Sequence, residues 1–352
     1  MEPNTTFPLL KLPPLCIQNV FLEIEIFDLI NISFASRKCH WLMKTVRTPL
    51  KQLNVEVKKN HCDIVFLLDK FVPYGGWCIK LNNSKNGIQL TQFSGTPGIR
   101  KLAHETGIDI SSRMKDYYII TEDPLLSLRI GIFYFLDLFR IPLGGLCFVS
   151  HGLTASKRLI DKEKEEEYEL EKMESEEFKY MIENFKFTRD LILDKPVSPN
   201  FYCDPIHFKF NRMLIEKKSC GWITRDFLFK LEVGDIRLKC CDVSKLTVHD
   251  IEDFVDRWYQ SDDKKFELLL VEWNKDPGQF DFSRFVAVKW VENKAQRSRY
   301  KLYTQTWKMD LLEGWDFIRR DGLMATVAPR VNALIFCVWH DRFPNTEGAQ
   351  IC

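Results

Sequence analysis

The chain has 352 residues, enough for one large domain or for two to three smaller ones that each bury a core. Its formal net charge is +1 with 28% charged residues, so no basic field points to nucleic acid or anionic lipid as a partner. The 11 cysteines are odd in number and lie largely among apolar neighbours, a pattern typical of reduced, buried thiols inside the cell rather than of a disulfide framework.

The N-terminal region predicts neither a secretory signal nor a membrane anchor. Glu2 and Lys11 bracket a short apolar run that prolines interrupt, unlike a signal peptide. The most apolar stretch of the chain, 130–136, is far shorter than the roughly 20 residues that a membrane helix needs. We therefore expect a soluble protein of the cytoplasm or nucleus, with no membrane and no nucleic acid among its partners.

Residues 7–46 predict three short helices after an extended segment at Leu12 and Pro13. We expect Asp28 to separate the first helix from the second, which runs to Ser36, and a third helix to carry Trp41. A unit of this size buries too little apolar surface to be stable alone, so its apolar stripe needs a partner or the rest of the chain. That stripe recurs at helical spacing and consists of Ile17, Val20, Phe21 and Ile24.

These residues resemble an F-box, together with Leu29 after Asp28 and the Ser36-Arg37-Lys38 run before Trp41. The preceding segment 7–10 resembles the one found in the nematode-type branch of that family. The resemblance implies that the helices bind the small SKP adaptor of SCF-type cullin-RING ubiquitin ligases, while the rest of the chain selects a protein substrate. An ordinary helical hairpin that packs on its own protein is the alternative. The implied adaptor-binding residues are Leu9, Leu12, Pro13, Ile17, Val20, Phe21 and Leu29.

Residues 49–122 predict a small β-rich connecting segment. Short β-branched or aliphatic runs alternate there with turn formers, among them Pro73–Gly76, and this alternation is typical of an antiparallel meander. The expected strands cover 55–57, 63–68, 78–81 and 88–90.

From residue 123 the pattern alternates between helix and strand. Such alternation favours parallel strands, and its loose repeat resembles an irregular leucine-rich-repeat array, although the asparagine that marks such repeats is absent. The expected helices cover 125–139, 171–185, 223–231 and 248–259, and the expected strands 146–149, 191–193, 236–238 and 266–271.

The order of elements from Trp222 to Leu270 resembles the F-box-associated (type 2) domain of the nematode-type family, and 316–327 resembles its terminal β-hairpin. Asp321-Gly322 predicts a type I′ turn in that hairpin. Thr247 stands three residues before Asp250, which predicts a capping box at the start of the helix over 248–259. Where this family commonly has Asn-x-Phe, the chain has Glu252-Asp253-Phe254. We therefore assign no role to a side-chain amide at this position.

The run 161–177 has ten acidic residues against three lysines. Such a run forms a solvated helix face or loop, or alternatively an acidic docking surface for a basic substrate tail.

We find no pattern for catalysis, a cofactor or a metal. The chain has no Cys-x-x-Cys, His-Glu-x-x-His, Walker-type loop or Gly-x-Ser-x-Gly. Cys203 and His207 lie four residues apart, with Cys220 further on, but these spacings match no zinc module. We therefore expect no catalytic residues, no cofactor and no metal site, and the sequence identifies no substrate-binding residues.

The sequence thus predicts a mixed α/β, multidomain protein with an F-box at 7–48, a β-rich segment at 49–122, helix–strand repeats at 123–210 that include the acidic run, and an F-box-associated domain at 211–342. We expect a non-enzymatic substrate-recognition subunit of an SCF-type ligase. A chain with a degenerate F-box that acts as a stand-alone binding scaffold, or as a cryptic hydrolase, is the alternative. We also expect the part beyond Thr48 to fold without the helices.

Overall fold

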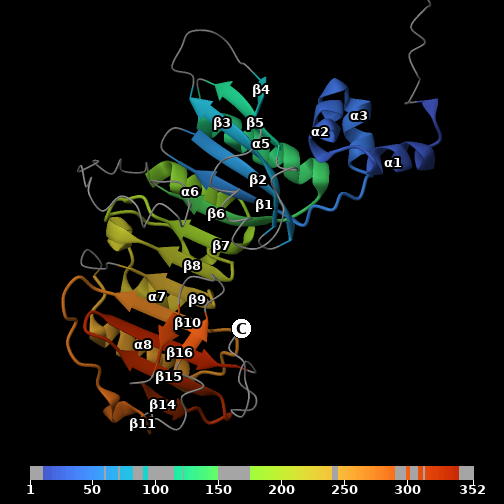
Figure 1. The fold of residues 1–352 in the computed structure, drawn as a ribbon. Coiled ribbons are helices and arrows are strands. Elements are labelled where there is room, and N and C mark those ends of the chain that lie inside the picture. Colours follow the sequence, from blue (N-terminus) through green and yellow to red (C-terminus); the bar gives the residue numbers. More distant parts are fainter. Residues whose placement is uncertain are drawn as a thin grey trace, which may run out of the picture. The chain divides into compact units, whose positions relative to one another are not determined.

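The computed structural model describes residues 11–58, 61–69, 72–81, 90–93, 115–121, 123–149, 175–239, 245–289, 299–301, 308–311 and 314–340 (Figure 1). The fold is mixed α/β, as the sequence predicted. The chain divides into two compact units, one of residues 1–146 with 151–166 and one of residues 147–150 with 167–352. The four-part division of the sequence is finer than this and stays a prediction.

The three expected N-terminal helices are present as α1 (Pro14–Leu22), α2 (Ile26–Ala35) and α3 (Arg37–Met43). The break after α1 lies before Ile26, not at Asp28, which sits in the first turn of α2 where a carboxylate favours the positive end of the helix dipole. Ser36 does not continue α2 either. Its backbone is extended, and its side chain caps α3 by accepting a hydrogen bond from the Cys39 amide at 3.1 Å.

The predicted meander begins as expected, with β1 (Gln52–Val57), β2 (His61–Asp69) and β3 (Val72–Leu81) antiparallel in order. It then departs from a simple meander, because β5 (Lys115–Thr121) lies between β3 and β4 (Leu90–Phe93) and runs parallel to β3. The expected turn at 73–76 is wrong. These residues belong to β3, where the register with β2 shifts, so the turn formers mark an irregular strand.

Helix α5 (Pro124–Phe139) covers this sheet, as its apolar spacing predicted. Asp123 caps its start, accepting from the Leu126 amide at 2.9 Å, and Arg140 ends it in the left-handed conformation at φ 54°. Phe135 on its buried face lies 5.2 Å from Phe66 and 5.3 Å from Trp77, measured between ring centroids. Strand β6 (Leu143–Phe148) follows and leads from the first unit into the second.

The second unit begins with the parallel strands that the sequence predicted. Strands β7 (Phe187–Leu193), β8 (Arg212–Ile215), β9 (Asp235–Leu238) and β10 (Leu268–Glu272) pair in parallel in this order. The sequence did not predict β8, a four-residue strand between two longer loops. Helix α6 (Ser175–Asn184) precedes β7, α7 (Arg225–Lys230) lies between β8 and β9, and α8 (Val248–Gln260) lies between β9 and β10. No α-helix separates β7 from β8, a stretch that the structure describes in full. The predicted capping box of Thr247 and Asp250 is present.

The antiparallel half of this sheet continues in the order β10, β16 (Ala333–Trp339), β15 (Met324–Pro329), β14 (Trp315–Ile318) and β11 (Val288–Lys289). Strands β12 (Arg299–Lys301) and β13 (Lys308–Asp310) form a separate antiparallel pair. The hairpin expected near the end of the chain is β14–β15. It is not the last element, because β16 follows and pairs with both β15 and β10.

The turn of this hairpin differs from the predicted type I′. Gly322 has φ 87° and its amide donates to the Arg319 carbonyl at 2.9 Å. A type I′ turn requires positive φ at both central residues. Within the described residues Arg140 is the one non-glycine residue with positive φ, so Asp321 does not meet this condition. The turn is therefore a type I turn that ends in a glycine bulge.

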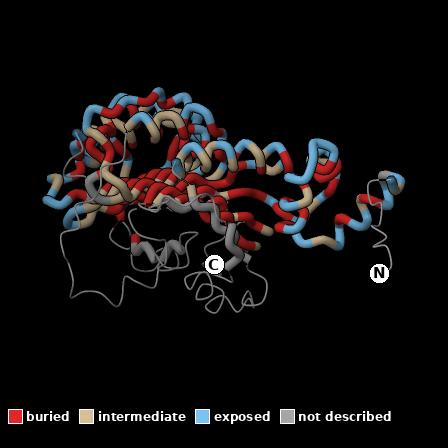
Figure 2. Tube along the Cα trace, turned by 90° about the horizontal axis from the view of Figure 1, so that it is seen from above, coloured by how far each residue is buried: buried red, intermediate tan, exposed pale blue. Residues whose placement is uncertain are grey.

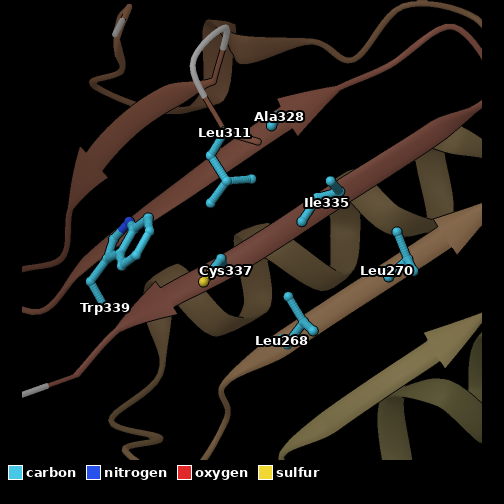
Figure 3. Packing of buried hydrophobic residues seen from close by; sticks show 7 residues of the cluster. All are labelled: Leu268, Leu270, Leu311, Ala328, Ile335, Cys337 and Trp339. Atoms are coloured by element: carbon cyan, nitrogen blue, oxygen red, sulfur yellow. The ribbon is translucent and has the colours of Figure 1, made fainter. Parts of the chain in front are cut away.

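Buried residues concentrate in the strands, and the outward sides of the helices are exposed (Figure 2). The sheet around β10 and β16 is buried on both faces. Trp258 of α8 packs on Phe336 at 5.2 Å, and the alternate residues of β16 face the other side, where they join a second apolar cluster (Figure 3). The members of that cluster are Leu268, Leu270, Leu311, Ala328, Ile335, Cys337 and Trp339.

Eight cysteines fall within the described residues and all eight are free thiols, seven of them buried and Cys16 exposed. The acidic run lies outside the described residues except for Ser175, Glu176 and Glu177, which begin α6.

In the part of the chain that the structure describes, no helix combines the length and the apolar character needed to cross a membrane.

Candidate functional site

The residues that the sequence assigned to adaptor binding divide into two groups. Ile17, Phe21 and Leu29 are buried, and Phe21 has no exposed surface. The other described members are accessible: Pro13 and Val20 are exposed and Leu12 is half-buried. Leu9 lies outside the described residues. The predicted stripe is thus not one surface, since its buried members belong to the core of the first unit.

Helix α2 packs against α5 and the sheet. Phe27 is fully buried against the edge of the Phe66 ring, with centroids 5.6 Å apart. Ser33 Oγ and Tyr134 Oη are 2.5 Å apart, and the Ile26 amide donates to Tyr74 Oη at 3.4 Å. These contacts join α2 to the core of the first unit, which argues against the expectation that the chain beyond Thr48 folds without the helices.

Asp137 of α5 also holds α3. Its two carboxylate oxygens accept from Lys44 Nζ at 2.5 Å and from His40 Nε2 at 2.9 Å. Hydrogen bonds from Lys44 and then His40 lower the pKa of Asp137, because they favour its charged form. The Asp137 side chain is 54% exposed, so Lys44 and Asp137 form a surface ion pair and not a buried one.

The helices expose other large apolar side chains that the sequence argument missed. Leu15 is 74% exposed and Leu22 56%, and they lie seven residues apart, hence two turns apart on one face of α1. Phe34 of α2 and Trp41 of α3 are also exposed, although Phe34 stacks on Tyr134 at 4.9 Å. The i, i+7 spacing of Leu15 and Leu22 is visible in the sequence, but the longer stripe of Ile17 and Phe21 predicts another face of the helix as the outer one.

A hollow of about 440 Å³ lies in the second unit, between the loop at 199–205 and α7. Its lining carries both signs of charge, from Lys230, Lys245 and Asp226, so charge alone does not select a class of ligand. Cys203 also lines it. Burial raises the pKa of this thiol to about 11, so it stays protonated near neutral pH and is a poor nucleophile. His207 is exposed, and within the described residues it forms no metal-ligand group with Cys203.

A polar cluster lies at one end of strands β1 to β3. Asp63 is directly opposite Glu56 on β1 and Cys78 on β3. Lys58 Nζ bonds to Asp63 and lies 2.7 Å from Glu56 Oε2, and His61 Nε2 is 3.5 Å from Asp63 Oδ2. Spacing along the sequence did not reveal this group, because strand pairing brings its members together.

The charges of this cluster support one another. Burial alone would raise the pKa of Asp63, but hydrogen bonds from His61, Lys58 and Cys78 outweigh burial and lower it to about 2. Burial would likewise lower the pKa of Lys58, but the attraction of Glu56 and Asp63 outweighs it and raises that pKa. At neutral pH the cluster therefore holds a carboxylate and an ammonium group in contact.

Comparisons with protein-family models, with curated proteins and with solved structures find no match. The function of the chain is therefore inferred from its own residues.

Proposed function

We propose that the chain is a substrate-recognition subunit of an SCF-type cullin-RING ubiquitin ligase. Helices α1–α3 dock on the SKP adaptor, and the rest of the chain, including an F-box-associated, repeat-like second unit, holds a protein substrate. The chain acts by proximity, because a substrate lysine held near a charged ubiquitin carrier reacts as if the encounter were intramolecular. No catalytic side chain is required of the chain itself.

The observation that carries this proposal is the exposed apolar surface on the three N-terminal helices. Leu15 and Leu22 share a face of α1, and Trp41 of α3 is 64% exposed. Large apolar side chains gathered on so small a helical unit are typical of a protein-binding surface. The lead-in at Leu12 and Pro13, both accessible, precedes α1 as in the F-box pattern.

The test measures binding of purified SKP adaptor to the full chain by calorimetry. Burying a leucine side chain contributes roughly 1.5 to 3 kcal/mol, so Leu15→Asp with Leu22→Asp should weaken binding at least about a hundredfold. Leu12→Asp with Pro13→Ala tests the lead-in in the same way. Because all four side chains are accessible, the variants should keep the thermal midpoint and circular dichroism of the wild type.

A matched control places the same charge on exposed apolar residues of the second unit. Ile318→Asp with Val331→Asp alters side chains that are 60% and 84% exposed, and should leave adaptor binding unchanged. Adaptor binding that stays within a few fold in the folded α1 variant would contradict the ligase-subunit proposal. Phe21 is unsuitable for this test, because a charge in its buried site would unfold the unit.

The second candidate is a stand-alone binding scaffold with a degenerate F-box. The burial of Ile17, Phe21 and Leu29 favours it, because three of the seven residues that the F-box resemblance implies for adaptor contact belong to the chain's own core. A full chain that recovers no adaptor from any pull-down, yet folds, would support this candidate.

A further inference from the structure

Three side chains with metal-binding atoms meet on one face of the sheet in the first unit. The ligand atoms of His61, Asp63 and Cys78 all lie within 4.8 Å of one another. His61 and Asp63 are two residues apart on β2 and therefore face the same side, and Cys78 stands directly opposite Asp63 on β3. Because paired strands set their spacing, the three donors are held together by the backbone.

These donors suit a particular class of ion. Thiolate sulfur, imidazole nitrogen and carboxylate oxygen together are typical ligands of Zn²⁺, whereas Mg²⁺ and Ca²⁺ prefer oxygen donors alone. Glu56 is not one of these three, but it stands directly opposite Asp63 on β1, where a side-chain rotation would bring its carboxylate to the ion as a fourth donor. Four donors of this kind make the tetrahedral set that zinc prefers.

In the structure the ammonium group of Lys58 already binds the carboxylates of Glu56 and Asp63. It bonds to Asp63 and lies 2.7 Å from Glu56. Lys58 follows the last residue of β1, and its side chain is 14% exposed, so its ammonium group is largely shielded from water. The lysine thus marks where the two carboxylates hold a positive charge.

We propose that Glu56, His61, Asp63 and Cys78 form a zinc site from which Zn²⁺ displaces Lys58. On binding, the Cys78 thiol releases its proton to solvent and its thiolate sulfur binds the ion, while Lys58 leaves as an intact ammonium group. The site carries one net negative charge in both states: two carboxylates with the ammonium before, and two carboxylates and a thiolate with the divalent ion after. This site is independent of the proposed ligase function.

The experiment titrates Zn²⁺ into the metal-free, reduced full chain against a chromophoric chelator, and repeats the titration with Co²⁺ to detect thiolate-to-metal charge-transfer absorption. The wild type should bind one equivalent of Zn²⁺. Cys78→Ser and His61→Gln should each lower the Zn²⁺ affinity by more than the roughly 10- to 100-fold that the loss of an outer-shell partner costs. Lys58→Met, which removes the competing cation, should tighten binding roughly tenfold or more. Mg²⁺ should not compete.

Cys62→Ser is the matched control. Cys62 is a buried thiol beside Asp63 on β2, but it faces the opposite side of the sheet. The Cys62→Ser chain should still bind one equivalent of Zn²⁺ and should keep the charge-transfer band with Co²⁺. Equal Zn²⁺ and Co²⁺ binding by the wild type and a folded Cys78→Ser chain would overturn the site, and unchanged affinity in Lys58→Met would overturn the displacement of the lysine.

Discussion

At the scale of single residues, Arg319 shows how one charged side chain holds the end of the β14–β15 hairpin. It is 1% exposed, and its guanidinium lies 4.7 Å from the centre of the Trp258 ring. Nη1 donates to the Asp263 carbonyl at 2.8 Å, and Nε and Nη2 donate to the two oxygens of Asp321. The bidentate pair lowers the pKa of Asp321, because it favours the carboxylate. One side chain thus joins the turn, α8 and the loop before β10.

Replacing Arg319 should therefore cost far more than replacing its neighbour. We expect Arg319→Ala to lower the free energy of unfolding of the second unit by about 1 to 3 kcal/mol, because the backbone carbonyls of Trp258 and Asp263 lose their donor. Arg320→Ala removes an exposed pair with Asp262 and should leave the free energy of unfolding almost unchanged. Denaturant unfolding of both variants measures the difference. Equal losses would show that Arg319 does not hold the turn.

At the scale of elements, the attachment of α3 to α5 depends on an ionised carboxylate. Asp137 accepts from His40 and Lys44, and these bonds lower its pKa below the value in the unfolded chain. A carboxylate of this kind stabilises the fold above the unfolded pKa of about 3.9. The stabilisation is then lost as the pH falls through the lowered pKa of the folded state.

The pH dependence of an Asp137 variant follows from this sign. At pH 7 we expect Asp137→Asn to melt at a lower temperature than the wild type, because the hydrogen bonds to Lys44 and His40 weaken. The gap should begin to close as the pH falls below about 4, where the carboxyl of the unfolded chain becomes protonated, and should vanish below the lowered pKa of the folded state. Glu232→Gln, at an exposed carboxylate of the second unit, should show no such closing gap. A gap independent of pH would contradict the role of the charge.

At the scale of the whole molecule, the N-terminal helices belong to one of the two compact units. Phe27 of α2 packs on Phe66 and Tyr74 of the sheet, and Ser33 bonds to Tyr134 of α5. The second unit has its own core between α8 and the sheet, as the contact of Trp258 with Phe336 illustrates. Loss of the helices should therefore affect the two units differently.

A chain that lacks residues 1–48 tests this difference. We expect limited proteolysis to cut it quickly within 49–146, because the aromatic face under α2 is uncovered, while fragments of the second unit stay protected. In the full chain, Phe27→Ala should destabilise the first unit by about 3 to 5 kcal/mol, and Phe34→Ala, at a side chain that is 54% exposed, by less. Equal protection of 49–146 with and without the helices would contradict the prediction.

The sequence by itself determined the features that depend on neighbours along the chain. The 3.6-residue spacing of apolar side chains predicted α5 and α8, and Thr247 with Asp250 predicted the cap of α8. The alternation of helix and strand predicted that β7, β9 and β10 run parallel, although β8 lies between β7 and β9. Each of these signals is local, so one segment contains all the information that it needs.

Only the tertiary structure decided what depends on pairing between distant segments. Periodicity shows that α1 has an apolar stripe, but not that Ile17 and Phe21 are covered by their own unit while Leu15 and Leu22 remain outside. Strand order placed β5 between β3 and β4, which no local pattern indicates. Register likewise set Cys78 opposite Asp63, because a shift of one residue would turn its thiol to the other face of the sheet.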